Sequence, residues 1–461
     1  MASEASSSTQ SPLLDGPILR SLLRVAIPVI LSNLLQSLYG TIDAFWVGRL
    51  GDNAVAAISI SQPINFLAFA LGSGLSVAGS TLIAQHIGAR QHAQANHIAA
   101  QSLLMAVAFA AILMVLGQWA APLLITWFHA APAVYDDAVS FLRITLGGIV
   151  FTFGFAMVQS LMRGAGQVRV PLFIVGGTVL LNLVIDPPLI FGWGPIPALG
   201  VPGAAIATLI TQALALAGGL AVLSSKRIAI SVHLKDLKPD PGAIWHALRL
   251  GVPSSIELSA RALGANGMMF LIASFGTITT AAYGVVNNIN LLVIIPGLGF
   301  SMANAALVGQ NIGAGQIERA KSIGRLSAIL AFLSLSLVGL IMFVFAYWII
   351  ALFIPGEQQV ISTAEHFLHI VAPSYGLIGL QMALAGIFRA AGRTVITMKL
   401  ALISQWLVQL PLAWLLSLNS LLGMTGLWLA FPLTNILMAV ITFVWYRRLD
   451  WQKARLVSSQ K

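Results

Sequence analysis

Three carboxyl side chains lie inside long apolar stretches of this 461-residue sequence, where a charge is costly. They belong to Asp43, Asp186 and Glu257. An ionised aspartate at the centre of a membrane-spanning helix costs about 2.5–3.5 kcal/mol on insertion scales, so such residues are candidates for ion or substrate paths. These three acids are therefore the first positions at which we expect function.

Asp43 and Asp186 are predicted to lie at the same depth. Asp43 precedes Val47, where its apolar run ends, by four residues, and Asp186 precedes Phe191 by five. At about 1.5 Å per residue, both would lie about 6–8 Å from the same face of the membrane. The two carboxylates are then able to share one cavity.

Polar residues at helical spacing accompany both aspartates. One stripe of the first helix consists, at steps of three, four and three residues, of Asn33, Gln36, Gly40 and Asp43. Tyr39 lies one turn before Asp43, and Asn182 lies one turn before Asp186. Both aspartates are therefore expected to have hydrogen-bonding neighbours on their own helices.

Prolines suggest that the two helices bend. Pro28 predicts a kink in the first helix, and Pro187 with Pro188 predicts a bend that frees backbone carbonyls. Two carboxylates in one partly dry pocket are poorly solvated and repel each other, which favours uptake of a proton near neutral pH. Protonation from outside would change the hydrogen bonds of Asp43 and let its helix bend. The alternative is that Asp43 and Asp186 only bond structurally to neighbouring Asn and Gln side chains.

Glu257 has a simpler interpretation. Arg261 follows one turn later on the same helical face, so the two residues are expected to form an i,i+4 ion pair. A paired charge is cheaper in lipid and less free to titrate. We therefore favour a structural ion pair over a second ion site.

The composition places these acids in a membrane protein. The chain is 58% hydrophobic and 8% charged, with a mean hydropathy of +0.90 and no cysteine, which excludes disulfide and thiol chemistry. Apolar runs long enough to span a bilayer number twelve. They lie near 20–47, 54–84, 96–118, 138–162, 170–190, 202–224, 244–274, 279–308, 323–354, 362–387, 395–418 and 424–446.

The basic residues predict how these spans are oriented. With a cytoplasmic N-terminus, 21 of the 24 Lys and Arg residues fall on inner segments, and only Arg49 falls on an outer loop. This asymmetry predicts that both termini lie in the cytoplasm. The net charge of +10 then faces anionic lipid, so a nucleic-acid partner is not expected.

The second half of the chain repeats the first. IAQHIGARQ (83–91) returns as VGQNIGAGQ (308–316), a shift of 225 residues, and MRGAG (162–166) returns as FRAAG (388–392). Six spans per copy give parallel repeats, which suit a two-lobed transporter that rocks about a central cavity. A duplicated scaffold without transport is the alternative.

The repeat also defines the expected domains. They are a disordered cytoplasmic tail (1–19), an N-lobe (20–227), a cytoplasmic linker (228–243), a C-lobe (244–450) and a cytoplasmic tail (451–461). Asp43 aligns with Met268 and Asp186 with Gln409, so the second lobe lacks both acids. Any ion coupling is therefore assigned to the N-lobe.

Other residue patterns indicate little chemistry of their own. Asn33, Phe153, Met157 and Met268 are candidates for lining a substrate cavity, although such residues are more often packing. His86, His92 and His97 have no metal-binding spacing and are interpreted as a solvated loop, so we expect no metal site. The sequence contains no Walker motif, so ATP is not the direct energy source.

These features together resemble the multidrug and toxic compound extrusion (MATE) family over the whole chain. IPVILSNLLQSLYGTIDAFWVGRLG resembles the family's first helix, IAQHIGARQ and VGQNIGAGQ its second and eighth, and NLVIDPPLIFG its fifth. The aspartate of the first helix and the Asn-x-x-x-Asp-Pro of the fifth are similar to the DinF-like branch.

The resemblance implies a fold and a function. The fold is an all-α, V-shaped integral membrane protein of twelve transmembrane helices in two pseudo-symmetric six-helix lobes. The implied function is a monomeric antiporter of the cell inner membrane, not an enzyme and without a cofactor, that exports organic cations in exchange for protons or Na⁺. Asp43 would be the principal protonation site, and the first helix would bend at Pro28. The residues implied around Asp43 are Gln36, Tyr39, Asn182, Asp186 and Thr208.

Two other functions are alternatives for a membrane protein of this kind. A flippase for lipid-linked oligosaccharides needs basic groups in its cavity to hold a diphosphate, and only Arg143 and Arg261 lie within spans. An intramembrane enzyme should show a catalytic histidine or carboxylate in a loop motif, which the sequence does not contain.

Overall fold

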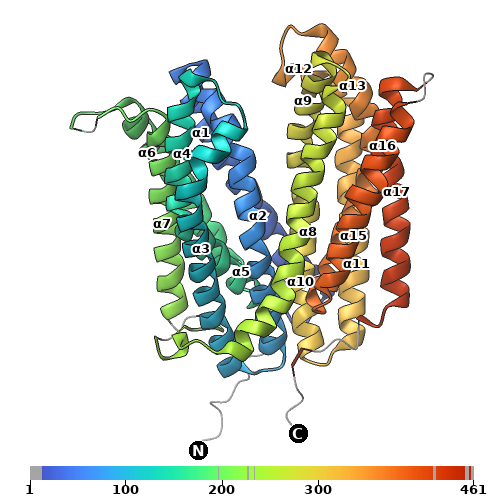
Figure 1. The fold of residues 1–461 in the computed structure, drawn as a ribbon. Coiled ribbons are helices and arrows are strands. Elements are labelled where there is room, and N and C mark those ends of the chain that lie inside the picture. The colour runs from blue at the N-terminus through green and yellow to red at the C-terminus, as the bar shows by residue number, and fades with distance from the viewer. Residues whose placement is uncertain are drawn as a thin grey trace, which may run out of the picture.

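The computed structural model of the chain describes residues 13–195, 197–225, 228–232, 234–418, 422–451 and 456–457. Every regular element in these ranges is a helix. The helices form two bundles that converge at the end where α1 begins and α17 ends and spread apart at the other end (Figure 1). We call these the closed end and the open end. This is the predicted all-α, V-shaped, two-lobed fold.

The N-lobe contains seven helices within six spans. They are α1 (Ile18–Val47), α2 (Asp52–Gly88), α3 (His92–Trp127), α4 (Pro132–Gly147), α5 (Ile149–Gly164), α6 (Arg169–Phe191) and α7 (Val201–Ser224). A short 3-10 helix, η1 (Gly48–Leu50), follows α1. Helices α4 and α5 form one span that bends by 45° at Gly148.

The C-lobe repeats this plan with more breaks. Its helices are α8 (Pro241–Ala273), α9 (Thr277–Val293), α10 (Ile295–Gly313), α11 (Ile317–Val344), α12 (Ala346–Phe353), α13 (Gln358–Val371), α14 (Tyr375–Ala390), α15 (Thr394–Leu402), α16 (Leu410–Ser417) and α17 (Gly423–Arg448). Short 3-10 helices are η2 (Leu234–Leu237), in the linker before α8, and η3 (Ala372–Ser374), which joins α13 to α14. A π-helical segment (Ile403–Gln409) joins α15 to α16.

The spans agree with the twelve predicted from the sequence. In the described part of the chain, ten helices or continuous helix pairs are long and apolar enough to cross a membrane, and the bent α4–α5 pair makes eleven. The twelfth is α8, which has 33 residues but carries Glu257 and Arg261. Each lobe therefore has six spans, as the parallel repeat requires.

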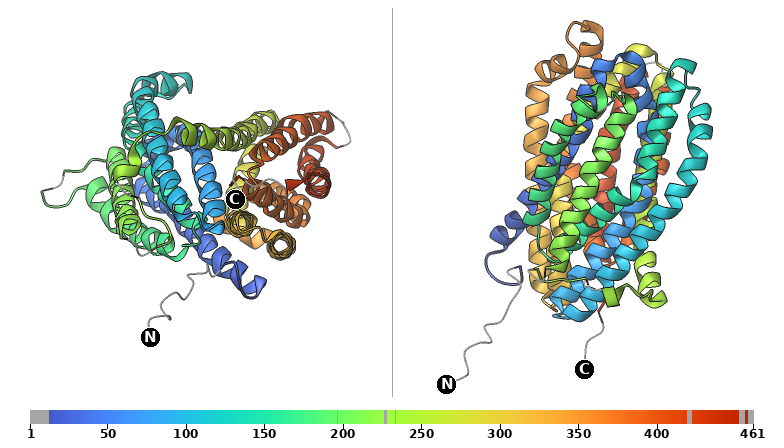
Figure 2. Two further views of the ribbon diagram at one scale, coloured as in Figure 1. Left: turned by 90° about the horizontal axis from the view of Figure 1, so that it is seen from below. Right: turned by 90° about the vertical axis from the view of Figure 1, so that its left-hand side faces the viewer.

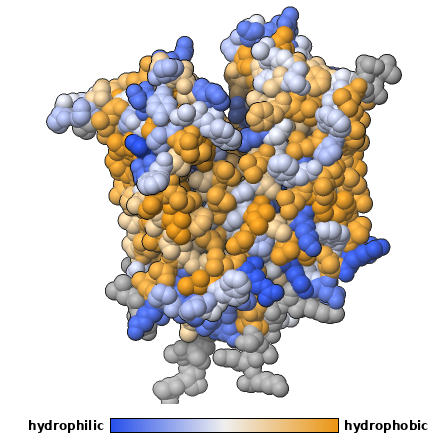
Figure 3. All heavy atoms as spheres, viewed as in Figure 1, coloured by the Kyte–Doolittle hydropathy of each residue, from blue (hydrophilic) through white to orange (hydrophobic). Residues whose placement is uncertain are grey.

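The outer surface is apolar because lipid is its solvent. Large side chains such as Trp119, Phe270 and Leu352 are 81–87% exposed. Figure 3 shows hydrophobic residues over both flanks and a hollow between the lobes at the open end. Inside the lobes, small residues let helix backbones approach each other closely.

The repeated glutamine–glycine motifs join the lobes at the closed end. Gln85 of α2 donates to the carbonyl oxygen of Ala390 at 2.8 Å, and Gln310 of α10 donates to that of Gly164 at 2.9 Å. A Cβ at Gly88 would overlap the carbonyl oxygen of Gln310, and one at Gly313 would overlap that of Gln85. The view along the molecule from this end shows the two lobes side by side (Figure 2).

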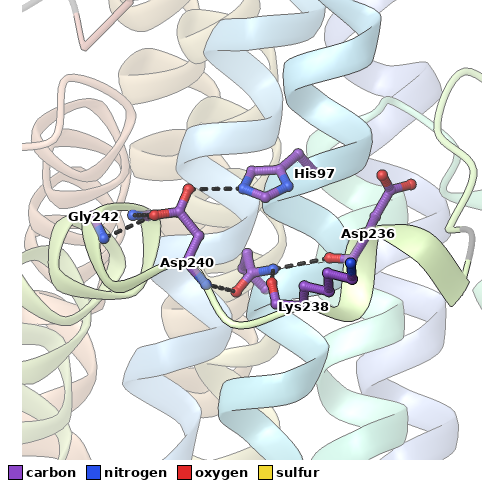
Figure 4. Close-up of polar contacts among 7 residues, drawn as sticks. His97, Asp236, Lys238, Asp240 and Gly242 are labelled. Atoms are coloured by element: carbon purple, nitrogen blue, oxygen red, sulfur yellow. Dashed lines mark hydrogen bonds and ion pairs between the residues drawn. The ribbon is translucent and has the colours of Figure 1, made fainter.

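The linker between the lobes is hydrogen-bonded to the N-terminal part of α3. Gln101 donates to the carbonyl oxygens of Asp236 and Lys238 at 2.9 and 2.7 Å (Figure 4). His97 Nε2 lies 2.9 Å from Asp240 Oδ2, and the other oxygen of Asp240 caps α8. The interpretation of the histidines as a solvated loop was wrong, because they lie on α2 and α3, and His86 is buried. The last three residues predicted for the linker, 241–243, belong to α8.

The described part of the N-terminal tail is packed against the protein. Leu13 and Leu14 are only 4% and 7% exposed, and α1 begins at Ile18. The prediction of a disordered tail therefore does not hold for residues 13–19, because Leu13 and Leu14 are buried and residues 18 and 19 already belong to α1. Residues 1–12 lie outside the described residues, as do 226, 227 and 233 near the predicted linker, and 452–455 and 458–461 in the predicted C-terminal tail.

Candidate functional site

Helix α1 carries Asp43 towards α7 at the open half of the N-lobe. The hydroxyl of Thr208 donates to Asp43 Oδ2 at 3.1 Å. The other carboxylate oxygen, Oδ1, is buried and has no hydrogen-bond partner among the described residues. One carboxylate oxygen thus accepts a hydrogen bond from a neighbouring helix, and the other accepts none.

Helix α6 carries Asp186 into the same site. Asn182 Nδ2 donates to Asp186 Oδ1 at 2.8 Å, one helical turn away, and both side chains are fully buried. Asp186 Oδ2 is buried without a partner among the described residues. Helix α6 continues through Pro187 and Pro188 to Phe191, so the prolines do not end the helix. They nevertheless cannot donate the usual helical hydrogen bonds.

The two carboxyl groups interact directly. Asp43 and Asp186 contact each other side chain to side chain, and the Asn182 amide lies near Asp43 without forming a hydrogen bond of normal geometry to it. Because two ionised carboxylates offer only acceptors, neither can satisfy the other. A proton on either carboxyl group would therefore supply a donor that the two unpartnered oxygens otherwise lack.

Tyr39 and two threonines complete the polar lining. Tyr39 is 8% exposed, and its hydroxyl lies beside Thr178 of α6 and Thr211 of α7 without a hydrogen bond of normal geometry. Thr178 and Thr211 were not identified from the sequence. Their signal was spacing: Thr178 precedes Asn182 by four residues, and Thr211 follows Thr208 by three.

The other site residues predicted on α1, Asn33 and Gln36, form no hydrogen bond with either aspartate among the described residues. Asn33 lies 3.9 Å from the sulfur of Met302, on α10 of the other lobe. Gln36 is partly buried between Asn33 and Tyr39 along the helix. Helix α1 is continuous through Pro28, so the predicted kink does not interrupt it in this conformation.

Three residues predicted to line a substrate cavity are buried in the cores of the lobes instead. Phe153 is 4% exposed and stacks on Phe109, with 6.0 Å between ring centroids. Met157 and Met268 are each 1% exposed, in clusters of the N-lobe and the C-lobe. Apolar residues occur on every face of a transmembrane helix, so composition alone does not identify the residues that face a cavity.

The C-lobe holds a buried acid in a charged cluster, at a different position in the repeat from the aspartate pair. Glu257 is 1% exposed and lies 3.7 Å from Arg261, as the i,i+4 spacing predicted. Its closer partner is Arg389 of α14, at 2.5 Å, which also donates to Ser301. This carboxylate is therefore held by two cations, in contrast to the pair in the N-lobe.

Among the described residues, two parallel bundles with a carboxylate pair between the helices of one of them form the arrangement expected of a two-lobed membrane transporter. A family model described as MatE matches residues 28–187 and 253–415, one segment in each lobe. The chain belongs to the MATE family. As a member, it is a multi-pass membrane transporter of small molecules and not an enzyme.

Relatives match along nearly the whole chain. "Probable multidrug resistance protein YoeA" of Bacillus subtilis is 27% identical, over 95% of each chain. "Probable multidrug resistance protein NorM" of Thermotoga maritima is 25% identical, over 96% of this chain and 95% of the relative. "FAD transporter" of Shewanella oneidensis is 28% identical, over 95% of this chain and 96% of the relative.

Solved structures share the fold. A MOP superfamily transporter from Pyrococcus furiosus superposes with a TM-score of 0.89 at 25% identity, over 94% of this chain and 96% of the other. An outward-facing multidrug resistance MATE family transporter superposes with a TM-score of 0.89 at 24% identity, over 95% of this chain and 97% of the other. The second likeness establishes the fold only.

Proposed function

We propose that this protein is a secondary active antiporter that exports amphipathic, cationic compounds in exchange for protons. The relatives named as multidrug resistance proteins support the class of cargo, and the aspartate pair of the N-lobe supports the ion. Na⁺ is the alternative coupling ion, because oxygens from Asp, Asn, Tyr and Thr suit Na⁺ as well as a proton network.

One observation carries the proton assignment. Asp43 Oδ1 and Asp186 Oδ2 are both buried without a donor, in carboxyl groups that contact each other. An unpaired buried charge is expensive, whereas one proton bound between the two groups supplies a donor and removes one charge. Proton binding and release at this pair are therefore the events that coupling would use.

Helix α1 is the element that would transmit these events. Protonation of Asp43 removes its charge and alters its bond to Thr208 on α7. Pro28 leaves α1 without one internal hydrogen bond, so that bending there is cheap. Asn33, between the two positions, contacts the C-lobe through Met302. A change at Asp43 would thus alter both the shape of α1 and its contact with the other lobe.

The direction of transport follows from the charge asymmetry of the loops. We propose that both termini are cytoplasmic and that the protein works as a monomer in the inner membrane. The open end then faces outwards, and cargo enters when the closed end separates. The driving force is about 2.3 kcal/mol per charge per 100 mV and about 1.4 kcal/mol per pH unit.

Ethidium efflux from proteoliposomes with an imposed pH gradient tests the proposal. Wild-type efflux should proceed without ATP and stop when an ionophore collapses the gradient. Asp43→Asn should abolish gradient-driven efflux, and Asp186→Asn should reduce it by at least tenfold. Asp52→Asn is the matched control, because Asp52 is an exposed aspartate at the start of α2.

The outcomes separate the alternatives. Normal gradient-driven transport by Asp43→Asn would refute coupling through the pair. Efflux that needs Na⁺ at fixed pH would show that the coupling ion is Na⁺ and not the proton. Export of FAD but not ethidium would show that the cargo is anionic and not cationic. Translocation of a lipid-linked diphosphate would favour a flippase, although Arg261, one of the two basic residues that the sequence places within spans, pairs with Glu257.

A further inference from the structure

Two short segments outside the helices pack apolar side chains against the closed end of the molecule. One is Leu13–Gly16, just before α1, and the other is Leu456–Val457, beyond α17. Leu13 is 4% exposed and Val457 is 4% exposed. Neither segment is part of a helix, so their burial needs an explanation other than the packing of spans.

The two segments occupy matching places in the two repeats. Leu13 packs on Gly166, where an added Cβ would lie 2.6 Å from the leucine Cδ1. Leu456 packs on Gly392, where an added Cβ would lie 2.8 Å from its Cδ1. Gly166 and Gly392 end the repeated motifs MRGAG and FRAAG. Each repeat thus has the same small site at this glycine, and a leucine side chain occupies it in both.

Each segment also reaches across to the other lobe. The carbonyl oxygen of Leu13 accepts from Asn311 at 3.5 Å, and that of Gly16 accepts from Arg319 at 2.9 Å, both in the C-lobe. The backbone N–H of Leu456 donates to Oε1 of Gln85, in the N-lobe, at 2.8 Å. Gln85 is the residue whose amide also holds the lobes together through Ala390.

The apolar contacts cross in the same way. Leu13 belongs to a buried cluster made mainly of C-lobe residues, such as Phe300 and Phe388. Leu456 packs against a cluster made mainly of N-lobe residues, such as Met162. The N-terminal segment is therefore buried against the C-lobe, and the C-terminal segment against the N-lobe.

We propose that these two segments are latches, each docked in a repeat-related site, that hold the lobes together at the closed end. The proposal rests on the proposed function in one respect: if the transporter alternates access, both latches must release before the closed end opens. A contact present in one state and absent from the other shifts the equilibrium by its full free energy. The latches therefore set how often the closed end separates.

Double electron–electron resonance can measure this, because the chain has no native cysteine. Spin labels at Ala93→Cys and Glu318→Cys, exposed repeat-related positions near the starts of α3 and α11, report the closed end. Labels at Asp52→Cys and Thr277→Cys report the open end in the same way. The test substitutions are Leu13→Ala and Leu456→Ala, singly and together. The matched control is Leu19→Ala, since Leu19 is 48% exposed at the start of α1.

Each latch substitution should raise the population with a separated closed end by about tenfold, because burial of leucine atoms is lost in one state only. The double variant should raise it further, with a matching approach of the labels at the open end, and Leu19→Ala should change neither. An unchanged distance distribution in the double variant would overturn the proposal. Distances are measured without cargo or ion gradient, so a failure of the antiport assignment would leave this result interpretable.

A second measurement is hydrogen exchange at the Leu456 and Val457 amides. Gln85→Ala removes the acceptor of the Leu456 N–H, so exchange there should accelerate at least tenfold relative to wild type. Exchange in the first turn of α17 should be unchanged, because that turn lies at the open end. Equal exchange in wild type and Gln85→Ala would show that the C-terminal segment is not held by the N-lobe.

Discussion

Arg389 and Arg261 both approach the carboxylate of Glu257, but under unequal conditions. Arg389 Nη2 lies 2.5 Å from Glu257 Oε1 and its side chain is 19% exposed. Arg261 Nη2 lies 3.7 Å from the same oxygen and its side chain is 51% exposed. The contact between Arg389 and Glu257 is shorter and less exposed, so it should contribute more to stability than the contact between Arg261 and Glu257, which solvent screens.

We therefore predict different costs for the two substitutions. Arg389→Ala leaves a buried carboxylate poorly paired and should lower the free energy of unfolding by about 3–5 kcal/mol. Arg261→Ala should cost about 0–1 kcal/mol. Unfolding in detergent, followed by tryptophan fluorescence against denaturant, measures both. Adding Glu257→Gln to Arg389→Ala should recover part of the loss, and equal costs for the two single variants would contradict the assignment.

The site shows what residue patterns predict and what they miss. Asp43, Asn182 and Asp186 could be found because a polar group in an apolar run is conspicuous, and helical spacing pairs it with its neighbours. Arg389 could not be identified as the partner of Glu257, because 132 residues separate them. Spacing on one helix predicts contacts within that helix, whereas contacts between helices depend on how the bundle packs.

Gly88 and Gly313 allow helices α2 and α10 to approach each other closely. Gly88→Ala should force the helices apart, since a Cβ there would overlap the carbonyl oxygen of Gln310. Overpacking of this kind costs about 1–3 kcal/mol, and Gly313→Ala should behave alike by the repeat. Gly218→Ala is the control, because no atom lies within 4 Å of its Cβ position and the change should stabilise α7. Thermal unfolding in detergent distinguishes the three, and equal melting temperatures would contradict the close contact.

The anchor between α3 and the linker predicts a dependence on pH. The hydrogen bond from His97 holds the pKa of Asp240 below its ordinary value of 3.8. The folded state then binds this proton less readily than the unfolded state. The stabilisation is therefore present above about pH 4 and is lost as the pH falls through the lowered pKa.

Hydrogen exchange at the amides of Gly242 and Ala243, which Asp240 caps, measures this loss. After correction for the intrinsic rate, protection should decrease as the pH falls below about 4. Asp240→Asn should remove that decrease, while Asp52→Asn should preserve it. A decrease of the same size in Asp240→Asn would show that another group is responsible.

At the scale of the whole molecule, the repeat in the sequence predicted the architecture. Six spans per copy required parallel lobes, and the structure has them. The repeat does not predict that its copies touch: IAQHIGARQ and VGQNIGAGQ are equivalent in the sequence, but their contact across the lobes is a feature of the three-dimensional structure. Equivalent segments of two parallel repeats lie at the same depth, and whether they meet depends on how the lobes converge.

Alternating access requires that this contact between the lobes breaks during transport. Ala84 of α2 and Gly309 of α10 face each other across it, and an added Cβ at Gly309 would lie 2.9 Å from that of Ala84. Cysteines at both positions should form a disulfide after a small adjustment, since bridged Cβ atoms lie about 3.5–4.5 Å apart. No native cysteine competes.

Oxidised Ala84→Cys/Gly309→Cys should lose at least 90% of ethidium efflux, a loss of about tenfold or 1.4 kcal/mol, and dithiothreitol should restore it. Each single variant should transport in both redox states. Full efflux through a quantitatively cross-linked protein would mean that the lobes do not separate at the closed end, and that cargo passes by another route.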